Sequence, residues 1–466
     1  MSNFFHITDI EIENFKNIEH GKISFPDKKE GSDSKNVLAL YGQNGSGKTS
    51  VIQAIELVRD IIQLQHIPSH FDSIITKNKE EILIKIFFLM ESNFKIFSGN
   101  YEIKIRKMES NLRITSESLS YNRLIKKEIE NGYHNEKANS YNHTLTCDLN
   151  NENEIFSLKS SNKKNELNVT IDDLLSNKSG LDLLVAKRKS FTEKQSLITN
   201  EHFINYLYNH EYAEIGIILE SLTIKFLIKT VVFSNWMNER KNMSGAYGIL
   251  PFISKDDKED KVFFLSKKDL NLAKEIFNQI NIVLPTMIPD LNVSLREIGN
   301  PLLKNGEEGI SIQLIAKKNG LTIPFQHESE GTKKIISLLS LFIAIYNDPD
   351  IFVAIDELDA GISEFLLGDI IKTINEHGKG QLLFTSHNLR LLEVLDCENF
   401  AFSTTNEKNR FIILQGIKQT NNLRSVYLRA IKLGGQSEEI YEKTSAFKMR
   451  KAFEHAGRIR YGKKDE

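Results

Sequence analysis

Short segments in the first part of the chain alternate apolar and polar positions. This alternation over residues 7–15 predicts a half-buried strand, because successive side chains of a strand point to opposite faces. Four further segments between residues 82 and 115 (82–88, 94–97, 101–106 and 112–115) repeat the pattern between Ser, Asn and Gly turns, and they predict an antiparallel meander. The continuous apolar run at 36–41 is instead typical of a buried parallel strand.

Helical spacing of apolar positions follows that buried strand and returns in the second half of the chain. Residues 48–65 carry Val and Ile at helical intervals and are followed by Pro68, which predicts a helix that ends there. Later segments alternate helices with strands, a pattern typical of an α/β fold. The elements expected there are helices at 268–283, 332–346 and 363–376, and strands within 292–315, at 351–355 and at 381–384.

The middle of the chain gives a different pattern. Residues 126–180 are rich in Asn, Ser, Lys and Glu, and we expect loops with short strands there. Residues 181–247 carry apolar clusters, at 215–219 and 222–232, which predict helices. No internal repeat and no sustained heptad pattern is visible.

Composition and charge narrow the class of protein. Hydrophobic residues make up 40% and charged residues 26% of the chain, as in ordinary globular proteins, and the formal charge is −2. Binding to nucleic acid would therefore need a local basic patch. Cys147 and Cys397 are too few for a zinc ribbon or a disulfide framework, and they fit a reducing compartment. With no signal peptide and no apolar run near the ~20 residues that span a bilayer, we expect a cytoplasmic protein without membrane contact.

A glycine-rich loop joins the buried strand at 36–41 to the helix that starts at Lys48. Residues 42–49 fit the phosphate-binding pattern G-x-x-x-x-G-K-[ST] at every fixed position, and the strand-and-helix context argues against a chance Gly/Ser loop. Backbone N–H groups of such a loop curl around an anion at a helix N-terminus. We expect Lys48 to reach the β- and γ-phosphates of ATP and the Thr49 hydroxyl to ligate Mg²⁺. The residues expected to bind the nucleotide here are Gly42, Asn44, Gly45, Ser46, Gly47, Lys48, Thr49 and Ser50.

The apolar segment 351–355 delivers two adjacent acids, Asp356 and Glu357, to the C-terminal end of a strand. Open α/β sheets bind their ligands at that end. We expect Asp356 to hold Mg²⁺ and Glu357 to polarise the attacking water. In isolation the pair could also be a solvated strand end, but the P-loop favours the catalytic interpretation.

Two further motifs complete the set. His387 follows the strand at 381–384, where an imidazole can donate to the γ-phosphate; a hydrogen-bonded surface histidine is the alternative. Ser329 and Gly331 stand at the start of the helix at 332–346 and predict a second anion-binding nest, with a plain helix N-cap as the alternative.

In this order the four motifs resemble the ABC-type ATPase heads of the SMC, RecF and OLD-nuclease superfamily. Residues 12–18 are also similar to the opening strand of that group. The resemblance implies that ATP lies between two subunits, with Ser329 and Gly331 of one chain at the γ-phosphate bound by the other. It further implies that Lys16 lies near the nucleotide phosphates.

Details of the motifs point to a narrower group. The stretch Asp-Glu-Leu-Asp-Ala-Gly from Asp356, together with Ser-His-Asn-Leu-Arg from Ser386, looks like compact ATPases of bacterial anti-phage defence loci such as PARIS, Septu and retron-associated systems. This implies an effector, a nuclease or toxin, acting in trans. The sequence departs from transporter heads, since Ser-Glu-Gly-Thr replaces Leu-Ser-Gly-Gly-Gln. Ser363 stands where SMC heads usually place an aspartate. No glutamine occurs between Gln65 and Gln195, so no residue is assigned to the glutamine that usually links the nucleotide to the lobe after the first helix.

Motif spacing suggests how the chain is divided. The expected parts are 1–175, an N-terminal ATPase lobe with the P-loop and antiparallel strands; 176–261, a helical insert; 262–415, a C-terminal ATPase lobe with the signature, acid pair and histidine; and 416–466, a basic helical tail. The interval from Lys48 to Asp356 is too long for a simple kinase or GTPase and too short for SMC arms. The 79 residues after His387 are too few for a TOPRIM domain, and no other nuclease cluster is evident, so we expect no intrinsic nuclease.

The last part of the C-terminal tail, residues 443–466, carries eight basic and three acidic residues. A solvated basic helix is one interpretation, and binding of nucleic acid or an acidic partner is the other. The basic residues are Lys443, Lys448, Arg450, Lys451, Arg458, Arg460, Lys463 and Lys464.

The leading hypothesis is a Mg²⁺-dependent ATPase switch that forms a homodimer or higher homo-oligomer and controls an effector. The alternatives are a RecF-like DNA-repair clamp that grips DNA, and a nucleotide-binding scaffold with negligible turnover.

Overall fold

The structure is a computed structural model of the whole chain. It describes residues 4–26, 36–62, 74–108, 111–124, 143–148, 155–160, 167–170, 204–205, 207–208, 213–225, 229–233, 263–299, 309–417 and 422–460. Three sheets lie within these residues.

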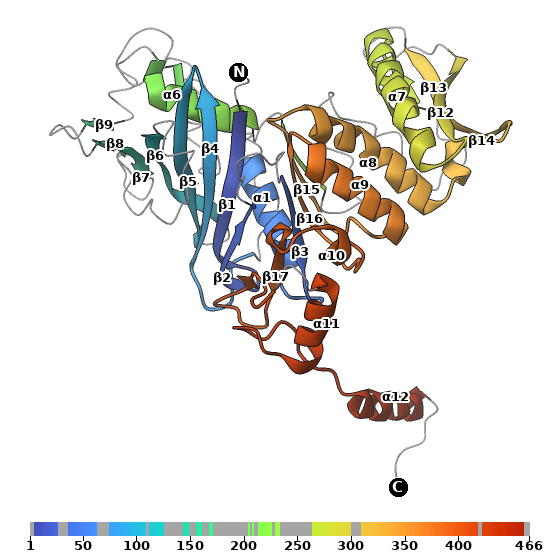
Figure 1. Cartoon of the computed structure of the whole chain (residues 1–466). Coiled ribbons are helices and arrows are strands. Elements are labelled where there is room, and N and C mark those ends of the chain that lie inside the picture. The colour runs from blue at the N-terminus through green and yellow to red at the C-terminus, as the bar shows by residue number, and fades with distance from the viewer. Residues whose placement is uncertain are drawn as a thin grey trace.

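An antiparallel sheet of eight strands forms one side of the molecule (Figure 1). Its order is β2 (Ile18–Ser24), β1 (Phe4–Phe15), β4 (Glu81–Ser92), β5 (Lys95–Met108), β6 (Asn111–Leu124), β7 (His143–Asp148), β8 (Ile155–Ser160) and β9 (Leu167–Thr170). The predicted meander is confirmed, with one difference: residues 94–97 and 101–106 do not form two strands. Gly99, which suggested a turn, lies inside β5, where a Cβ atom would come within 2.4 Å of the Ser120 carbonyl oxygen. The glycine therefore permits close strand packing and not a turn.

A second sheet of six strands forms the centre. Its order is β10 (Thr230–Phe233), β15 (Phe352–Ile355), β16 (Gln381–Thr385), β3 (Val37–Tyr41), β17 (Phe400–Ser403) and β18 (Phe411–Ile412). All pairs are parallel except β17 with β18. The strands predicted at 36–41, 351–355 and 381–384 are confirmed.

The helix predicted over residues 222–232 is wrong in its second half. Helix α6 (Ala213–Ile224) is followed by β10, which pairs with β15 as the edge strand of the central sheet. The reason is the run Thr230-Val231-Val232, whose β-branched side chains favour a strand once a neighbouring strand is available. The range 176–261 thus contributes a strand to the ATPase core, and most of it, including Gln195, lies outside the described residues.

Helix α1 (Lys48–Ile62) packs between the antiparallel and central sheets and is buried along nearly its whole length. Alternating residues of β3 face opposite layers: Leu38 and Leu40 join the core with α1, whereas Val37 and Ala39 join the core on the other face. Helices α8 (Glu330–Asn347), α9 (Glu364–His377) and α11 (Leu423–Leu433) supply that second core. The predicted α/β fold of an ABC-type head is therefore confirmed.

A small antiparallel sheet with its own helix lies beside α8 (Figure 1). It comprises β11 (Phe263–Leu265), β12 (Asn292–Gly299), β13 (Ile310–Lys318) and β14 (Leu321–Pro324), with α7 (Lys267–Met287) packed on β12. β14 leads through the short turn Phe325–His327 into α8. This sheet thereby carries the Ser329 motif. Among the described residues, no helix is both long and apolar enough to cross a membrane.

Candidate functional site

Strand order brings three sequence motifs to one edge of the central sheet. β15, β16 and β3 are parallel neighbours, so the acid pair, His387 and the P-loop all follow strand ends on the same side. Electrostatic interactions of Lys48 with Asp356 and Glu357 confirm that the P-loop and the acid pair lie close together.

The P-loop depends on glycine at three positions. Gly42, Gly45 and Gly47 have φ angles of +148°, +78° and +93°, which other residues rarely adopt. A Cβ atom on Gly42 would also lie 1.7 Å from the Ser403 Oγ. That hydroxyl, at the end of β17, lies 2.5 Å from the Ser46 Oγ and donates to the Tyr41 carbonyl. Ser403 at the end of β17 therefore holds the P-loop in place through Ser46 and Tyr41. The sequence patterns did not predict this contact.

Lys48 lies inside the curve of the loop. Its Nζ donates to the carbonyl oxygens of Gly42 at 2.8 Å and Gln43 at 2.9 Å. Burial lowers the pKa of Lys48 from its ordinary value, while the nearby carboxylates oppose that shift. Asn44, Gly45 and Thr49 are exposed on the loop, as expected for residues that meet a ligand.

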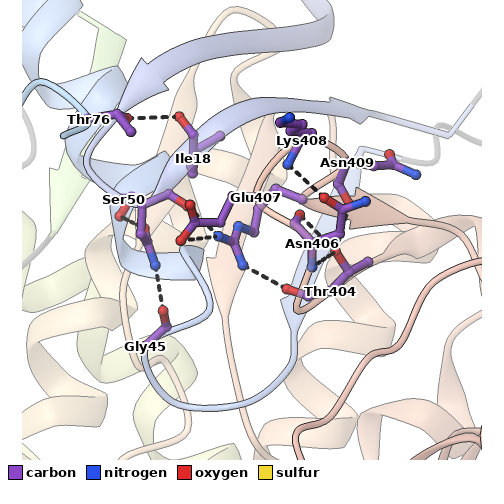
Figure 2. A network of polar contacts seen from close by, with 11 residues as sticks. Ile18, Gly45, Ser50, Thr76, Thr404, Asn406, Glu407, Lys408 and Asn409 are labelled. Atoms are coloured by element: carbon purple, nitrogen blue, oxygen red, sulfur yellow. Dashed lines mark hydrogen bonds and ion pairs between the residues drawn. The ribbon is translucent and has the colours of Figure 1, made fainter. Parts of the chain in front are cut away.

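The turn between β1 and β2 buttresses the loop (Figure 2). The Asn17 side chain donates to the Gly45 carbonyl and accepts from the Ser50 hydroxyl at 3.0 Å. Arg410 donates to the main-chain oxygens of Asn17 and Thr404. Asn17 directly follows Lys16 in the opening motif, so a closer interpretation of that motif could have found it; Arg410 carried no sequence signal.

Lys16 is adjacent to this turn but its amine points to α1. Its Nζ donates to the Gln53 Oε1 at 2.6 Å. Partial burial lowers the pKa of Lys16, with Glu56 acting in the opposite direction. Contact between Lys16 and the phosphates stays a prediction.

The acid pair is organised by a threonine that the sequence analysis missed. The Thr385 hydroxyl, at the end of β16, donates to the Asp356 Oδ1 at 2.5 Å and accepts from the Glu357 N–H at 2.7 Å. Glu357 has a φ of +50° and an exposed side chain. A residue with this left-handed backbone turns away from the strand direction, and it presents its carboxylate at the sheet edge.

His387 is held by an acid from the loop after β15. Its main-chain N–H donates to the Asp359 Oδ2 at 3.0 Å. Partial burial, followed by the charge of Lys48, lowers the pKa of His387 from its ordinary 6.5, while carboxylates from the same loop oppose the shift. The imidazole is therefore neutral near pH 7 and carries one N–H for donation.

Ser329 is the N-cap of α8, and its Oγ accepts from the Thr332 N–H at 3.1 Å. Ser329 is therefore a helix N-cap, which was the alternative to an anion-binding nest. It is also exposed to solvent. Gly331 has a close neighbour, since a Cβ atom there would lie 2.2 Å from the Gly361 carbonyl oxygen. Within the part of the chain that the structure describes, neither residue hydrogen-bonds to the P-loop of its own chain.

The donor set fits a magnesium nucleotide. The three glycines with positive φ leave room for a phosphate against the backbone N–H groups of the loop. The buried amine of Lys48 lies beside this space. The Thr49 hydroxyl and the Asp356 carboxylate are oxygen ligands of the kind that Mg²⁺ prefers.

The C-terminal segment also reaches the P-loop. The Gln43 side chain accepts from the Glu442 N–H at 2.9 Å and contacts its carbonyl oxygen at 3.5 Å. Four residues later the chain enters α12 (Ala446–Arg460), in which residues 446–456 are exposed. Lys463 and Lys464 of the predicted tail lie outside the described residues.

This chain is similar to solved structures of SMC head domains and of RecF. An Smc head domain from Pyrococcus furiosus, bound to the C-terminal domain of ScpA, is 15% identical, covers 88% of this chain and 96% of its own, and has a TM-score of 0.41. The SMC head from Thermotoga maritima is 13% identical with a TM-score of 0.36, covering 88% and 100%. The recombination mediator RecF with ATP is 12% identical with a TM-score of 0.35, covering 83% and 94%.

Curated proteins gave no match to this chain. The model of the RecF/RecN/SMC N-terminal domain family matches residues 6–410, which is most of the sequence. The chain therefore belongs to this family and is an ATP-binding ATPase head of the SMC and RecF type.

Proposed function

We propose that this protein is a Mg²⁺-dependent ATPase switch that works as a homodimer or higher homo-oligomer. The observation that carries the proposal is the convergence of the P-loop, acid pair and His387 at one sheet edge, with Thr385 hydrogen-bonded to both acids. This arrangement provides phosphate binding, metal ligation and activation of water within one site.

Each side chain has a distinct task in this proposal. Lys48 exchanges its hydrogen bonds with loop carbonyls for bonds to phosphate oxygens. The exposed Glu357 carboxylate orients and polarises a water molecule, and neutral His387 donates to the developing charge on the γ-phosphate. Thr49 and Asp356 would hold Mg²⁺, which neutralises phosphate charge when bound.

The N-terminal turn of α8 supports assembly across the nucleotide. Ser329 is exposed and does not hydrogen-bond to the P-loop of its own chain, so it is free to meet a neighbour's nucleotide together with Gly331. ATP binding would then join two chains and hydrolysis would release them. We further propose that this cycle controls a nuclease or toxin acting in trans, in anti-phage defence, because the Asp-Glu-Leu-Asp-Ala-Gly and Ser-His-Asn-Leu-Arg motifs resemble those of such ATPases.

The core proposal is tested with Glu357→Gln, which keeps the side-chain shape and removes the base. We expect kcat for ATP hydrolysis to fall about 100-fold or more, with ATP binding retained, and an ATP-bound dimer to accumulate. Glu376→Gln, an exposed glutamate on α9, is the matched control and should keep wild-type turnover.

Undiminished turnover in Glu357→Gln would refute the proposed chemistry. ATP-dependent oligomers with near-zero phosphate release from the wild-type protein would instead favour a nucleotide-binding scaffold.

A DNA-gripping clamp is a second candidate, favoured by α12. This helix carries five basic residues against one acid, and Arg450 and Lys451 lie over the exposed Phe447 ring. Such a surface can bind phosphate backbones without sequence preference.

Replacing Lys448, Arg450 and Lys451 with serine tests this candidate. If α12 binds DNA, the ATP-stimulated affinity for DNA should fall at least about 10-fold. The slope of log affinity against log salt concentration should also decrease by about two to three, because that many fewer counterions are released on binding. The control is the same replacement of Lys267, Lys268 and Lys274 on α7, which are exposed and remote in the fold. Equal effects in the two triple variants, or no DNA binding by the wild type at low salt, would exclude a specific role for α12.

A further inference from the structure

A buried lysine on α8 contacts the main chain of the proposed catalytic glutamate. Lys334 is in the first turns of α8, and only 4% of its surface is exposed. Its Nζ donates to the Glu357 carbonyl oxygen at 2.7 Å and to the Ala360 carbonyl oxygen at 2.9 Å. Both carbonyls belong to the loop that joins β15 to α9, so one amine ties this loop to the helix that starts at Ser329.

This contact fixes Glu357 in an unusual backbone conformation. A non-glycine residue at a φ of +50° is strained and persists only when its surroundings hold it. Thr385 accepts from the N–H of Glu357, and Lys334 donates to its carbonyl oxygen. The two hydrogen bonds fix the peptide groups on both sides of the residue and so set the direction of its carboxylate.

The same loop packs directly on the N-terminal turn of α8. The Cα region of Gly331 lies so close to the Gly361 carbonyl that no Cβ atom would fit. With the Lys334 hydrogen bonds three residues further along α8, this makes two successive attachments between the helix and the loop. The turn that carries Ser329 and the backbone of Glu357 are therefore connected through two neighbouring contacts.

The charge of Lys334 suits this place. Burial lowers the pKa of Lys334 to about 8, while the carboxylates of Asp359, Glu357 and Asp356 oppose this shift. A cation here offsets the mutual repulsion of the three acids. An apolar side chain of similar length would fill the space but would supply neither the charge nor the two hydrogen bonds.

We propose that Lys334 is a positioning residue of the ATPase, which holds Glu357 in its working geometry and couples it to the α8 turn that carries Ser329. The inference rests on the proposed function of Glu357. In a dimer of the proposed kind, Ser329 meets the neighbour's nucleotide while Glu357 acts on the nucleotide of its own chain. Lys334 thus makes hydrolysis at one site depend on engagement of the other.

The test compares Lys334→Met with Lys372→Met, an exposed lysine on α9, in the full chain. We expect Lys334→Met to bind ATP within about twofold of wild type but to lose about 10- to 100-fold in kcat, because the glutamate is misplaced and the P-loop is not. Lys372→Met should match the wild type in both quantities.

A double variant separates positioning from a general loss of structure. If Lys334 acts through Glu357, then adding Lys334→Met to Glu357→Gln should reduce the residual turnover no further. Independent, multiplicative losses would overturn the inference, as would wild-type kcat in a folded Lys334→Met protein or a parallel loss of ATP affinity.

Should Lys334→Met not fold, Lys334→Arg carries the test. It keeps the cation, but its longer planar guanidinium cannot occupy the position of the amine without displacing the Glu357 carbonyl. We expect a folded protein with ATP affinity kept and kcat lowered severalfold; wild-type kcat would overturn the inference. If Glu357→Gln itself retains full turnover, the proposed function fails, whereas loss in Glu357→Gln with none in the Lys334 variants refutes only the inference.

Discussion

A single hydroxyl at Thr385 organises two neighbouring acids whose tasks differ. The hydroxyl donates a hydrogen bond to the Asp356 carboxylate and accepts one from the Glu357 N–H, so it acts as donor and as acceptor. Replacement of this residue by valine would keep the shape and lose both bonds. The residue is almost fully buried, and in the sequence it is an ordinary strand end, so its part in the site emerges only when β15 and β16 pair.

The surroundings of His387 determine the pH at which its imidazole takes up a proton. Because burial and Lys48 lower its pKa in the folded protein, we expect its imidazole to titrate below the ordinary 6.5. The unfolded chain then takes up the proton at a higher pH than the folded chain. The contribution of His387 to stability is thus complete above about pH 6.5 and is lost as the pH falls from 6.5 toward the lowered folded pKa.

Nuclear magnetic resonance titration of the ring protons checks this expectation, with His387→Gln identifying the resonance by its disappearance. A midpoint below 6.5 is expected, and the acid limb of the kcat profile should lie no higher than that midpoint. A midpoint at or above 6.5 would contradict the electrostatic description of the site.

Two roles meet at Ser329, the N-cap of helix α8. Ser329 caps the helix through its Oγ, and the same exposed hydroxyl is the group proposed to meet a neighbour's phosphate. A helix cap needs a short side chain that accepts a hydrogen bond, whether it is neutral or negatively charged. Contact with a phosphate needs a side chain that is uncharged or donates a hydrogen bond. Substitutions can therefore separate these roles.

We expect Ser329→Ala to lower the free energy of unfolding by about 1 kcal/mol, while Ser329→Asn and Ser329→Asp keep it, because both side chains are good caps. The Asp variant should nevertheless lose ATP-dependent self-association, since its charge repels the γ-phosphate. Thermal melts and analytical sedimentation with and without ATP measure the two effects. ATP-dependent association of the Asp variant equal to that of the Asn variant would show that Ser329 is a cap and nothing more.

The elements that sequence patterns missed are those whose identity depends on a distant neighbour. β10 is a strand because β15 offers a parallel edge, although the apolar pattern of residues 222–232 predicts a helix. The sequence around Gly99 predicts a turn, because the close packing of Gly99 against Ser120 arises only when β5 and β6 pair. Helices with regular apolar spacing, such as α1 and α8, began within a few residues of where the pattern placed them.

For the whole molecule, motif order was enough to predict the fold and the meeting of P-loop, acid pair and His387. Parallel strands must place their C-terminal ends at one edge, so motifs at strand ends converge whatever separates them in sequence. The supports of the site were not predictable in this way. Arg410 reaches Asn17 across 393 positions of sequence, and Ser403 lies under Gly42, with no motif marking either pair.

The contact between Gln43 and Glu442 joins the segment before the C-terminal helix to the P-loop. Gln43 occupies a variable position of the P-loop pattern, yet it clamps the main chain four residues before α12 begins. Two hydrogen bonds of one side chain therefore tether the segment before α12 to the loop, so Gln43→Ala would detach the two without changing any fixed position of the P-loop pattern.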